Sequence, residues 1–360
     1  MKKICTIVGA RPQFIKLAVV SRELEGKFNE VVIHTGQHYD YNMSDIFFEE
    51  LDIKKPDYNL GVSGGTHAKM TADMLIKIED VLITEKPDMV LLYGDTNSTL
   101  AGALSAVKLN IPICHIEAGA RLGTLSNPEE ANRIATDHLS SLHLVCTETG
   151  MEFLKKEGKS HSSYLVGDPM YDAFLYYSNK ADDVKTLVGY NNETIEIPDK
   201  FYFMTIHRQE NTDEQTKLLE ILKAMNSLEH KTIYPVHPRA YKLVDEICLK
   251  NNFENIISVK PIGYLSSINL INRCEKIVTD SGGVQREAFF AKKPCVTIFD
   301  YVIWPETMKD NNNQMATPNK EDILNKLNKQ VNFDLTYQPF GDGHSAKKIV
   351  KHIEAYFLKA

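Results

Sequence analysis

The sequence has no long apolar run, no basic excess and no closely spaced cysteine pair. Although 43% of its 360 residues are hydrophobic, no stretch approaches the roughly 20 apolar residues that a membrane helix needs. The amino terminus has two lysines before a short apolar run, but it lacks the longer apolar core and cleavage site of a signal peptide. We therefore predict a buried first strand over 3–8, in a cytoplasmic protein that does not contact a membrane.

The charge balance argues against a nucleic-acid partner, because the net charge is −7 and a general nucleic-acid binder carries a basic excess. The six cysteines form no CxxC pair, and several stand in apolar runs, so they are interpreted as reduced core thiols. The scattered histidines and carboxylates show no HExxH or HxH spacing, and no GxGxxG or Walker loop occurs. Neither a metal nor a tightly bound cofactor is predicted.

Short apolar runs alternate with amphipathic stretches along the chain. The first series of strand-like runs covers 4–8, 30–34, 89–93, 111–116, 142–146 and 163–167. The second covers 201–207, 231–237, 255–261, 276–280 and 294–299. Apolar residues at helical spacing predict helices between strands, including 66–84, 214–228 and 283–291. Continuous apolar strands separated by helices indicate parallel sheets, so we predict an α/β fold with two Rossmann-like, doubly wound domains.

The periodic pattern weakens between about Tyr171 and Lys200, where the sequence is polar and rich in turn residues. We therefore expect an N-terminal domain over 1–170 and a C-terminal domain over 171–345. A last helix over 346–360 could pack on either domain and is expected to return to the first. Ligands of such sheets bind beyond the carboxyl ends of the strands, so the residues that follow each strand are the candidates for function.

The turn after the first strand could hold an anion. Gly9 permits a tight turn, Pro12 suits the first position of a helix, and Arg11 and Lys16 add positive charge beside the helix start. The alternative is an ordinary turn with surface cations.

Carboxylates follow the next strands of the first half. Asp95 comes after the run 89–93, where it could instead cap a helix, a role worth about 1 kcal/mol. Glu117 stands at a strand end with no helix start to cap, which favours a functional role. Glu129 and Glu130 begin a helix, and one of them could merely complement the helix dipole.

The second half supplies histidines and a glycine pair. His207 and His237 end two strands, and Ser281 with Gly282 and Gly283 opens a helix after a third. Glycines at such a helix start free backbone N–H groups to hold a phosphate. The two halves together predict a nucleotide ligand whose diphosphate rests on the second domain while its other part faces acid and base groups on the first.

An ordered set of motifs resembles the non-hydrolysing UDP-N-acetylglucosamine 2-epimerases over essentially the full chain. The motifs are GARPQFIK (9–16), HTGQHYD (34–40), YGDTNST (93–99), HIEAGAR (115–121), PEEANR (128–133), TIHRQEN (205–211), PVHP (235–238), TDSGGVQREA (279–288), KPCV (293–296) and FGDG (340–343). The spellings GARPQFIK, GGTH and GDTNSTLAGAL are especially similar to the branch that acts on UDP-2,3-diacetamido-glucuronic acid. The resemblance implies the GT-B architecture with the active site in the interdomain cleft, a homodimer, and a role in cell-surface polysaccharide synthesis.

The resemblance also implies a mechanism. Family members eliminate UDP to give a glycal and add it back with protonation of carbon 2 from the other face. The matching catalytic residues are Asp95, Glu117, Glu129 and His207. The matching substrate- and UDP-binding residues are Arg11, Lys16, Arg133, His237, Ser281, Gly282, Gly283 and Glu287. The implied partners are a UDP-2-acetamido sugar and UDP, and the expected reaction converts UDP-N-acetylglucosamine to UDP-N-acetylmannosamine.

The sequence departs from the family pattern at two places. Phe299 and Trp304 replace family arginines, which leaves the identity of the sugar open. Gln209 and the Tyr39-Asp40-Tyr41 segment replace residues of the regulatory site of bacterial members, so we expect that allosteric site to be absent. The alternatives are a 2-epimerase of a modified sugar such as UDP-2,3-diacetamido-glucuronic acid, a GT-B glycosyltransferase, and an inactive UDP-sugar-binding homologue.

Overall fold

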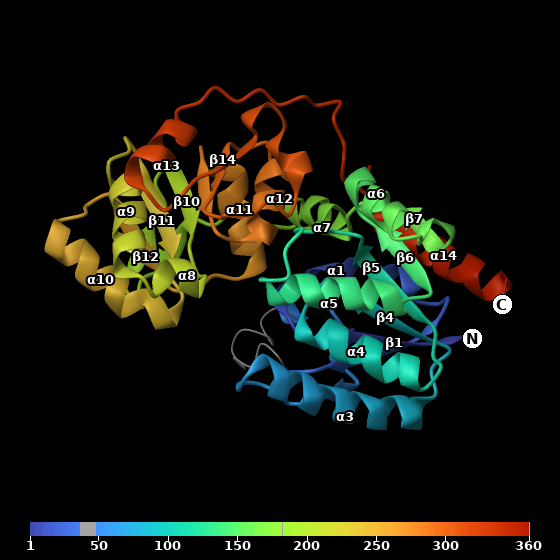
Figure 1. Ribbon diagram of the computed structural model, residues 1–360. Helices are drawn as coiled ribbons and strands as arrows, with labels where there is room; N and C mark the ends of the chain where they lie inside the picture. Colours follow the sequence, from blue (N-terminus) through green and yellow to red (C-terminus); the bar gives the residue numbers. More distant parts are fainter. Residues whose placement is uncertain (37–47, 182, 360) are drawn as a thin grey trace. The chain divides into compact units, whose positions relative to one another are not determined.

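Two parallel sheets with the same winding organise the chain. The computed structural model describes residues 1–36, 48–181 and 183–359, and the chain divides into unit 1 (Met1–Leu175 and Gln338–Ala360) and unit 2 (Tyr176–Tyr337) (Figure 1). The strand orders are β3-β2-β1-β4-β5-β6-β7 and β12-β11-β10-β13-β14-β15. In each sheet the order reverses beside the unit's first long strand, β1 or β10. The prediction of two doubly wound α/β domains is confirmed.

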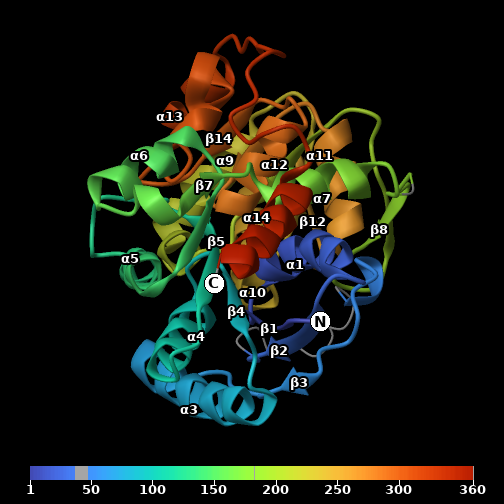
Figure 2. The same ribbon diagram turned by 90° about the vertical axis from the view of Figure 1, so that its right-hand side faces the viewer.

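Unit 1 carries its helices on both faces of the sheet. Its strands are β1 (Lys3–Val8), β2 (Asn29–His34), β3 (Tyr58–Asn59), β4 (Met89–Tyr93), β5 (Ile113–Ala118), β6 (Leu142–Val145) and β7 (Ser163–Leu165). Its helices are α1 (Arg11–Leu24), α3 (His67–Glu85), α4 (Asn97–Lys108), α5 (Pro128–Leu139), α6 (Glu148–Lys156), η1 (Ser160–Ser162), α14 (Ser345–Lys359) and most of α7 (Pro169–Ser178), whose last residues belong to unit 2. Helices α3, α4 and α5 pack side by side, and α14 packs on α1 at the other face (Figure 2).

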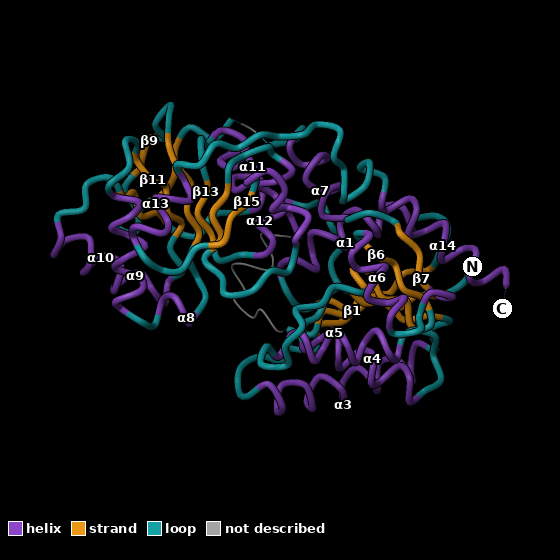
Figure 3. The backbone as a smooth tube through the Cα atoms, turned by 45° about the horizontal axis from the view of Figure 1, so that its top comes forward, coloured by secondary structure: helices purple, strands orange, loops and turns teal. Residues whose placement is uncertain are grey.

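Unit 2 contains a small hairpin before its main sheet. Its strands are β8 (Thr186–Val188), β9 (Thr194–Glu196), β10 (Phe201–Thr205), β11 (Lys231–Pro235), β12 (Ile256–Val259), β13 (Ile277–Thr279), β14 (Cys295–Thr297) and β15 (Asn313–Met315). Its helices are α8 (Gln209–Thr212), α9 (Gln215–Asn226), α10 (Pro238–Asn251), α11 (Tyr264–Arg273), α12 (Gly282–Phe290), η2 (Pro305–Asn311) and α13 (Lys320–Leu327). Figure 3 shows the parallel strands of this sheet between their helices.

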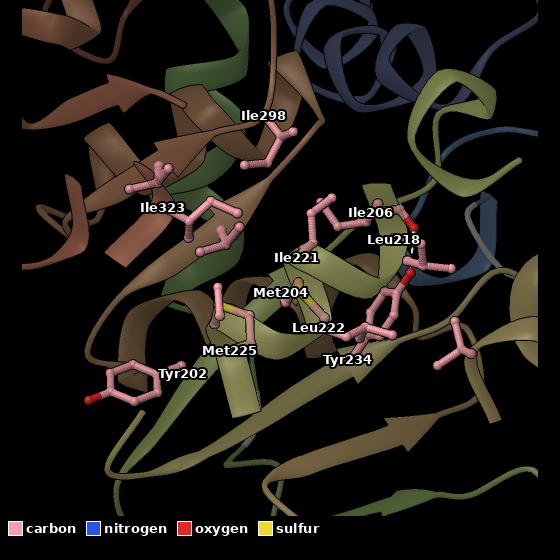
Figure 4. Packing of buried hydrophobic residues seen from close by; sticks show 14 of the residues in the cluster. Tyr202, Met204, Ile206, Leu218, Ile221, Leu222, Met225, Tyr234, Ile298 and Ile323 are labelled. Atoms are coloured by element: carbon pink, nitrogen blue, oxygen red, sulfur yellow. Dashed lines mark hydrogen bonds between the residues drawn. The ribbon is translucent and has the colours of Figure 1, made fainter. Parts of the chain in front are cut away.

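Alternation along the strands builds the core of unit 2. Tyr202 and Met204 of β10 point to one face, where they pack with α9 residues such as Leu222 and with Ile323 of α13 (Figure 4). Phe201 and Phe203 are also buried, on the opposite face of the same strand. A strand that is buried on both faces needs a continuous apolar run, which is the pattern that the sequence shows.

The observed division of the chain differs from the expected boundaries at 170 and 345. The first unit extends to Leu175, and the chain returns to it at Gln338. Asp172 of α7 holds the start of the helix of the returning segment, since its carboxylate accepts the N–H groups of Ser345 and Ala346 at 3.0 and 2.8 Å. In the part of the chain that the structure describes, no helix combines the length and apolar character needed to cross a bilayer.

Candidate active-site residues

The point where the strand order reverses in unit 1 brings together the turns after β1 and β4. The Gln13 side chain accepts N–H groups of Gly9 and Ala10 at 2.8 and 3.0 Å and donates to the Tyr93 carbonyl at 2.7 Å. A Cβ on Gly9 would lie 2.1 Å from Thr35 Oγ1, so this glycine allows close packing of the turn. Two of the N–H groups expected to hold an anion are thus satisfied within the protein, and Arg11 lies half-buried beside them.

Lys16 and Glu117 form a buried ion pair at this edge. The Lys16 ammonium contacts the Glu117 carboxylate, and the two side chains are 2% and 9% exposed. Glu117 has φ of 70°, in the left-handed region, and the pairing of β5 with β6 shifts register between Ile116 and Ala118. Such a conformation costs a residue with a side chain about 1–2 kcal/mol. A bulge that turns one carboxylate out of the strand is typical of a functional position.

A buried network holds the bulge in place. His115 lies between the Asp137 carboxylate and the Gly94 carbonyl, at 2.7 Å from each. Asp137 also accepts the Gly119 N–H at 3.0 Å and Arg121 at 2.7 Å. Burial alone would raise the pKa of Asp137, but His115 and Arg121 outweigh it and lower the pKa to about 2. The backbone on both sides of Glu117 is therefore anchored to α5.

Asp95 pairs with a buried arginine and does not cap a helix. Thr96 is the N-cap of α4, with its hydroxyl accepting from Thr99, while the Asp95 carboxylate contacts Arg133. Glu130 binds the same guanidinium at 2.7 Å. Burial would lower the pKa of Arg133, but these two carboxylates raise it. The structural alternative considered for Asp95 is wrong.

The two neighbouring glutamates of α5 have different environments. Glu130 is 1% exposed and accepts the N–H groups of Leu122 and Gly123 at 2.8 and 3.0 Å, so it has a structural role. Glu129 is half-buried in the first turn, where its N–H donates to the capping Asn127 side chain at 2.8 Å. Of the pair, Glu130 is therefore the one with the structural role, and Glu129 is the one kept as a candidate for catalysis.

At the reversal point of unit 2, a buried aspartate holds His207. Nδ1 of His207 lies 2.7 Å from Asp280, which also accepts the N–H groups of His207 and Arg208. Asp280 is fully buried; burial would raise its pKa, but the bond to His207 is chief among the contacts that lower it. An ionised carboxylate at Nδ1 leaves Nε2 of the half-exposed ring for a ligand. The sequence analysis did not select Asp280, although it directly precedes the predicted Ser281.

The first turn of α12 has open space beside Gly282 and Gly283. The Ser281 hydroxyl caps the helix by accepting from Val284 at 3.4 Å. A Cβ on Gly282 or Gly283 would meet nothing closer than 3.8 or 3.7 Å, and neither residue has positive φ. Neither packing nor backbone conformation therefore requires these glycines, which agrees with space kept for a ligand. Glu287, in the second turn of the same helix, is 4% exposed.

His237 has a local structural function. It is the exposed N-cap of α10, and its Nδ1 accepts the Arg239 N–H at 3.2 Å. Arg239 in turn donates to the carbonyl of His207 at 3.2 Å. The turn after β11 thus contacts the turn after β10.

The aromatic residues that replace family arginines make cation–π contacts with other arginines of unit 2. Arg208 lies over the rings of Phe299 and Tyr301, at 4.6 and 5.6 Å from their centroids. Arg286 lies 4.3 Å from the Trp304 ring. Positive charge is thus present beside both aromatics, on other elements of unit 2.

Among the described residues, one group of donor atoms is close enough to be considered for a metal ion. Glu117, Cys146 and Asp168 each contribute an atom within 4.8 Å of the other two. Glu117 already contacts the Lys16 ammonium, which competes with a cation for the same carboxylate. The segment Tyr39–Tyr41, which replaces regulatory-site residues of bacterial members, lies outside the described residues, whereas Gln209 begins α8.

Comparisons with known proteins indicate the family to which the chain belongs. The model of the family described as UDP-N-acetylglucosamine 2-epimerase matches residues 22–354. A UDP-N-acetylglucosamine 2-epimerase homolog of Methanococcus maripaludis is 47% identical, over 97% of this chain and 98% of its own. A UDP-2,3-diacetamido-2,3-dideoxy-D-glucuronate 2-epimerase of Pseudomonas aeruginosa is 42% identical over 98% and 99%.

A solved structure resembles the whole chain. The UDP-GlcNAc 2-epimerase of Methanocaldococcus jannaschii, crystallised with UDP-GlcNAc and UDP, superposes with a TM-score of 0.87 at 38% identity, covering 98% of this chain and 99% of its own. The chain belongs to the UDP-N-acetylglucosamine 2-epimerase family.

Proposed function

We propose that the protein is an isomerase that inverts carbon 2 of a UDP-linked 2-acetamido sugar, interconverting UDP-N-acetylglucosamine and UDP-N-acetylmannosamine. The observation that carries the proposal is the bulged, ion-paired Glu117 at a strand end beside the Asp95–Arg133 pair, in a chain of this family. A solved relative that binds UDP-GlcNAc and UDP supports the choice of ligand.

The proposal divides the ligand between two sets of residues. Ser281, Gly282 and Gly283 hold the diphosphate at the start of α12, with Glu287 and His237 assigned to the same ligand. His207, fixed by Asp280, serves the leaving phosphate through Nε2. Arg11, Lys16 and Arg133 supply positive charge on unit 1. The expected location of the ligand between the domains stays a prediction.

The chemistry needs acid and base groups because the proton on carbon 2 is not adjacent to a carbonyl. In elimination, a carboxylate takes this proton, the C1–O bond breaks, and the electron pair leaves with UDP to give a glycal. In addition, a phosphate oxygen of UDP bonds to carbon 1 while carbon 2 receives a proton on the other face. Asp95, Glu117 and Glu129 are the groups proposed for these transfers.

Proton exchange tests the proposal directly. The protein is incubated with UDP-N-acetylglucosamine in deuterated water without an acceptor sugar, and carbon 2 is followed by NMR. Deuterium at carbon 2 together with a UDP-N-acetylmannosamine signal is expected. UDP binding without exchange or product would contradict the proposed reaction with this sugar and would favour a modified sugar or an inactive nucleotide-sugar binder.

A second candidate substrate is UDP-2,3-diacetamido-glucuronic acid. The observation in its favour is that two arginines, Arg208 and Arg286, lie over the aromatic rings of Phe299 and Trp304, the positions where the sequence departs from the family pattern. A relative at 42% identity carries this activity in its name. The same exchange experiment with each sugar decides between them, since the true substrate should show the larger kcat/KM.

We further propose a cytoplasmic homodimer that serves cell-surface polysaccharide synthesis and lacks an allosteric site for UDP-N-acetylglucosamine. Light scattering should give twice the 40.8 kDa chain mass. Kinetics in the direction from UDP-N-acetylmannosamine should be hyperbolic without activator. A sigmoidal curve that becomes hyperbolic on adding a trace of UDP-N-acetylglucosamine would contradict the last point.

A further inference from the structure

The peptide group that leads into His207 is held at both of its polar atoms. Its N–H donates to the Asp280 carboxylate at 3.0 Å, and its carbonyl, which belongs to Ile206, accepts the hydroxyl of Tyr234 at 2.8 Å. Tyr234 is fully buried in β11, which pairs with β10. Burial, and to a smaller extent the nearby Asp280 carboxylate, raises the pKa of Tyr234, so its hydroxyl stays protonated and able to donate. This peptide can therefore turn only by breaking buried hydrogen bonds, which is unfavourable.

A second tyrosine holds the corresponding peptide after β11. The hydroxyl of Tyr190 donates to the carbonyl of Val236, the residue directly before His237. The N–H of Val236 donates to the carbonyl of Val259 at 3.0 Å. The Tyr190 ring also stacks on Tyr241 in the first turn of α10, with ring centroids 3.5 Å apart. Burial, followed by the Tyr241 phenol, raises the pKa of Tyr190 to about 12, so this hydroxyl is a donor at neutral pH as well.

Tyr190 comes from the small hairpin of unit 2. It follows β8, and the neighbouring Gly189 forms an antiparallel bridge with Val259 at the edge of the main sheet. The Lys260 N–H donates to the Val188 carbonyl at 2.9 Å. The hairpin is thus fastened to the end of β12, and this attachment determines where the phenol meets the turn after β11.

Arg239 connects the two turns. Its guanidinium donates to the His207 carbonyl at 3.2 Å, and its backbone N–H donates to Nδ1 of His237 at 3.2 Å. The backbone of His207 is therefore held at its N–H, at its own carbonyl and at the carbonyl before it, while Asp280 lies 2.7 Å from Nδ1 of the ring. These contacts leave Nε2 in one place, as a group that must meet a leaving oxygen requires.

We propose that Tyr234 and Tyr190 are positioning residues for His207, Tyr234 directly and Tyr190 through the turn that carries Arg239. The inference rests on the proposed 2-epimerase function, in which Nε2 of His207 serves the leaving phosphate. The hairpin of β8 and β9, which lies outside the main sheet, is then part of the catalytic unit. Neither tyrosine is assigned a contact with the ligand, so loss of either hydroxyl should lower the rate of UDP departure and return more than the affinity for UDP.

Phenylalanine at either position removes only the hydroxyl. Tyr234→Phe takes the donor from the carbonyl before His207, and Tyr190→Phe takes the donor from the carbonyl before His237. Tyr202→Phe is the matched control, because Tyr202 is a buried tyrosine at the opposite end of β10 from His207. For each variant we would measure kcat, KM, the Kd for UDP and the NMR signals of the His207 ring, which His207→Gln assigns.

The four measurements should separate positioning from binding. We expect kcat to fall about tenfold or more in Tyr234→Phe and about threefold or more in Tyr190→Phe, because a small displacement of a catalytic group lowers the rate steeply. KM and the Kd for UDP should stay within about twofold, since the contacts with the ligand are unchanged. The His207 ring signals should shift in both variants without ligand, and Tyr202→Phe should match the wild type in all four measurements.

Two results would overturn the inference. One is a kcat within about twofold of the wild type in both variants. The other is a loss of thermal stability with unshifted His207 ring signals, which would make the two hydroxyls structural alone. Tyr190 is half-buried, so its variant decides the question if Tyr234→Phe does not fold. Absence of carbon 2 exchange in the wild type contradicts the proposed function itself, while the ring signals still test the positioning of His207.

Discussion

At the scale of single residues, the catalytic assignment depends on two carboxylates with different surroundings. Glu117 is almost fully buried against Lys16, whereas the Asp95 side chain is 21% exposed and contacts Arg133. Such a difference suits groups that must act on opposite faces of one carbon, because the environment decides which of them gives up a proton more readily.

Removing either charge tests this assignment. Asp95→Asn and Glu117→Gln should each lower kcat by about 10²–10⁴-fold, the usual contribution of a positioned acid or base. The affinity for UDP, measured by calorimetry, should change little because the proposed diphosphate site is on unit 2. Ser281→Trp is the complementary variant and should abolish UDP binding. Losses of only about twofold in both carboxylate variants would exclude these residues as the acid/base groups.

The Asp280–His207 pair gives a second test at this scale. Asp280→Asn keeps the side chain's size but replaces the carboxylate that binds Nδ1 and two backbone N–H groups. We expect kcat to fall by at least about tenfold, because the ring that serves the leaving phosphate loses the carboxylate that orients it. A variant with lowered thermal stability but unchanged kcat would assign Asp280 a structural role alone.

The sequence identifies some of the candidate site residues but not the contacts between them, because the fold decides which side chains meet. His207 and Asp280 are far apart in sequence, and the strand order that joins them cannot be read from either motif. Asp168 lies in a turn that carries no recognisable motif. It comes near Glu117 because β6 pairs with both β5 and β7, and because the Phe340 carbonyl of the returning segment accepts its N–H. Glu129 and Glu130 are adjacent acids in the first turn of the same helix, and the burial and backbone contacts of Glu130 reveal its structural role only in the folded protein.

At the scale of elements, the start of α12 combines open space with an unstrained backbone. Alanine at Gly282 or Gly283 fits sterically and should raise the free energy of unfolding by up to about 1 kcal/mol, since glycine is unfavourable in helices. The added methyl group should nevertheless weaken UDP binding by at least about tenfold, as it occupies the ligand's space. Calorimetry and urea unfolding measure the two effects separately.

Gly9→Ala provides the contrast for that prediction. Its Cβ would collide with Thr35 Oγ1 at 2.1 Å, so this variant should lose stability. If the α12 variants behaved like Gly9→Ala, with lost stability and unchanged UDP affinity, the glycines would serve packing and the cradle assignment would be wrong.

The network between β5 and α5 predicts a pH-dependent stability. The pKa of Asp137 is lowered to about 2, so its contribution of about 2 kcal/mol is present above roughly pH 4 and lost as the pH falls towards 2. Asp137→Asn should therefore be less stable than the wild type near neutral pH, and the difference should narrow in acid. Urea unfolding between about pH 7 and pH 3 measures it. A constant difference across this range would contradict the prediction.

Strand positions were predictable because buried parallel strands need continuous apolar runs. Every predicted run contains a strand of the structure. The elements that were missed are short or polar: β3 and β15 pair at sheet edges, and β8 with β9 forms a hairpin inside the segment interpreted as a linker. Edge strands and hairpins bury little apolar surface, so their sequences carry little of the alternating pattern.

At the scale of the whole molecule, the chain leaves unit 1, builds unit 2 and returns. The return is specified by few residues: Phe340 is 2% exposed in unit 1, and Ile349, Val350 and Ile353 of α14 are fully buried. The last helix is predicted from the sequence and expected to return to the first domain, whereas the contacts that hold it, such as those between α14 and α1, depend on the fold.

The contact between Asp172 and the start of α14 makes this arrangement testable. Asp172→Ala leaves the buried N–H groups of Ser345 and Ala346 without their acceptor, at a cost of about 1–3 kcal/mol each. The loss falls on unit 1, so its unfolding should shift to lower temperature in calorimetry while the UDP affinity of unit 2 stays within about twofold. Saturating UDP should raise the unfolding temperature of unit 2 alone, because a ligand stabilises the unit that binds it. If the variant and the ligand instead moved a single transition together, the two units would unfold as one, and the returning helix would couple the UDP site to the carboxylates of the other sheet.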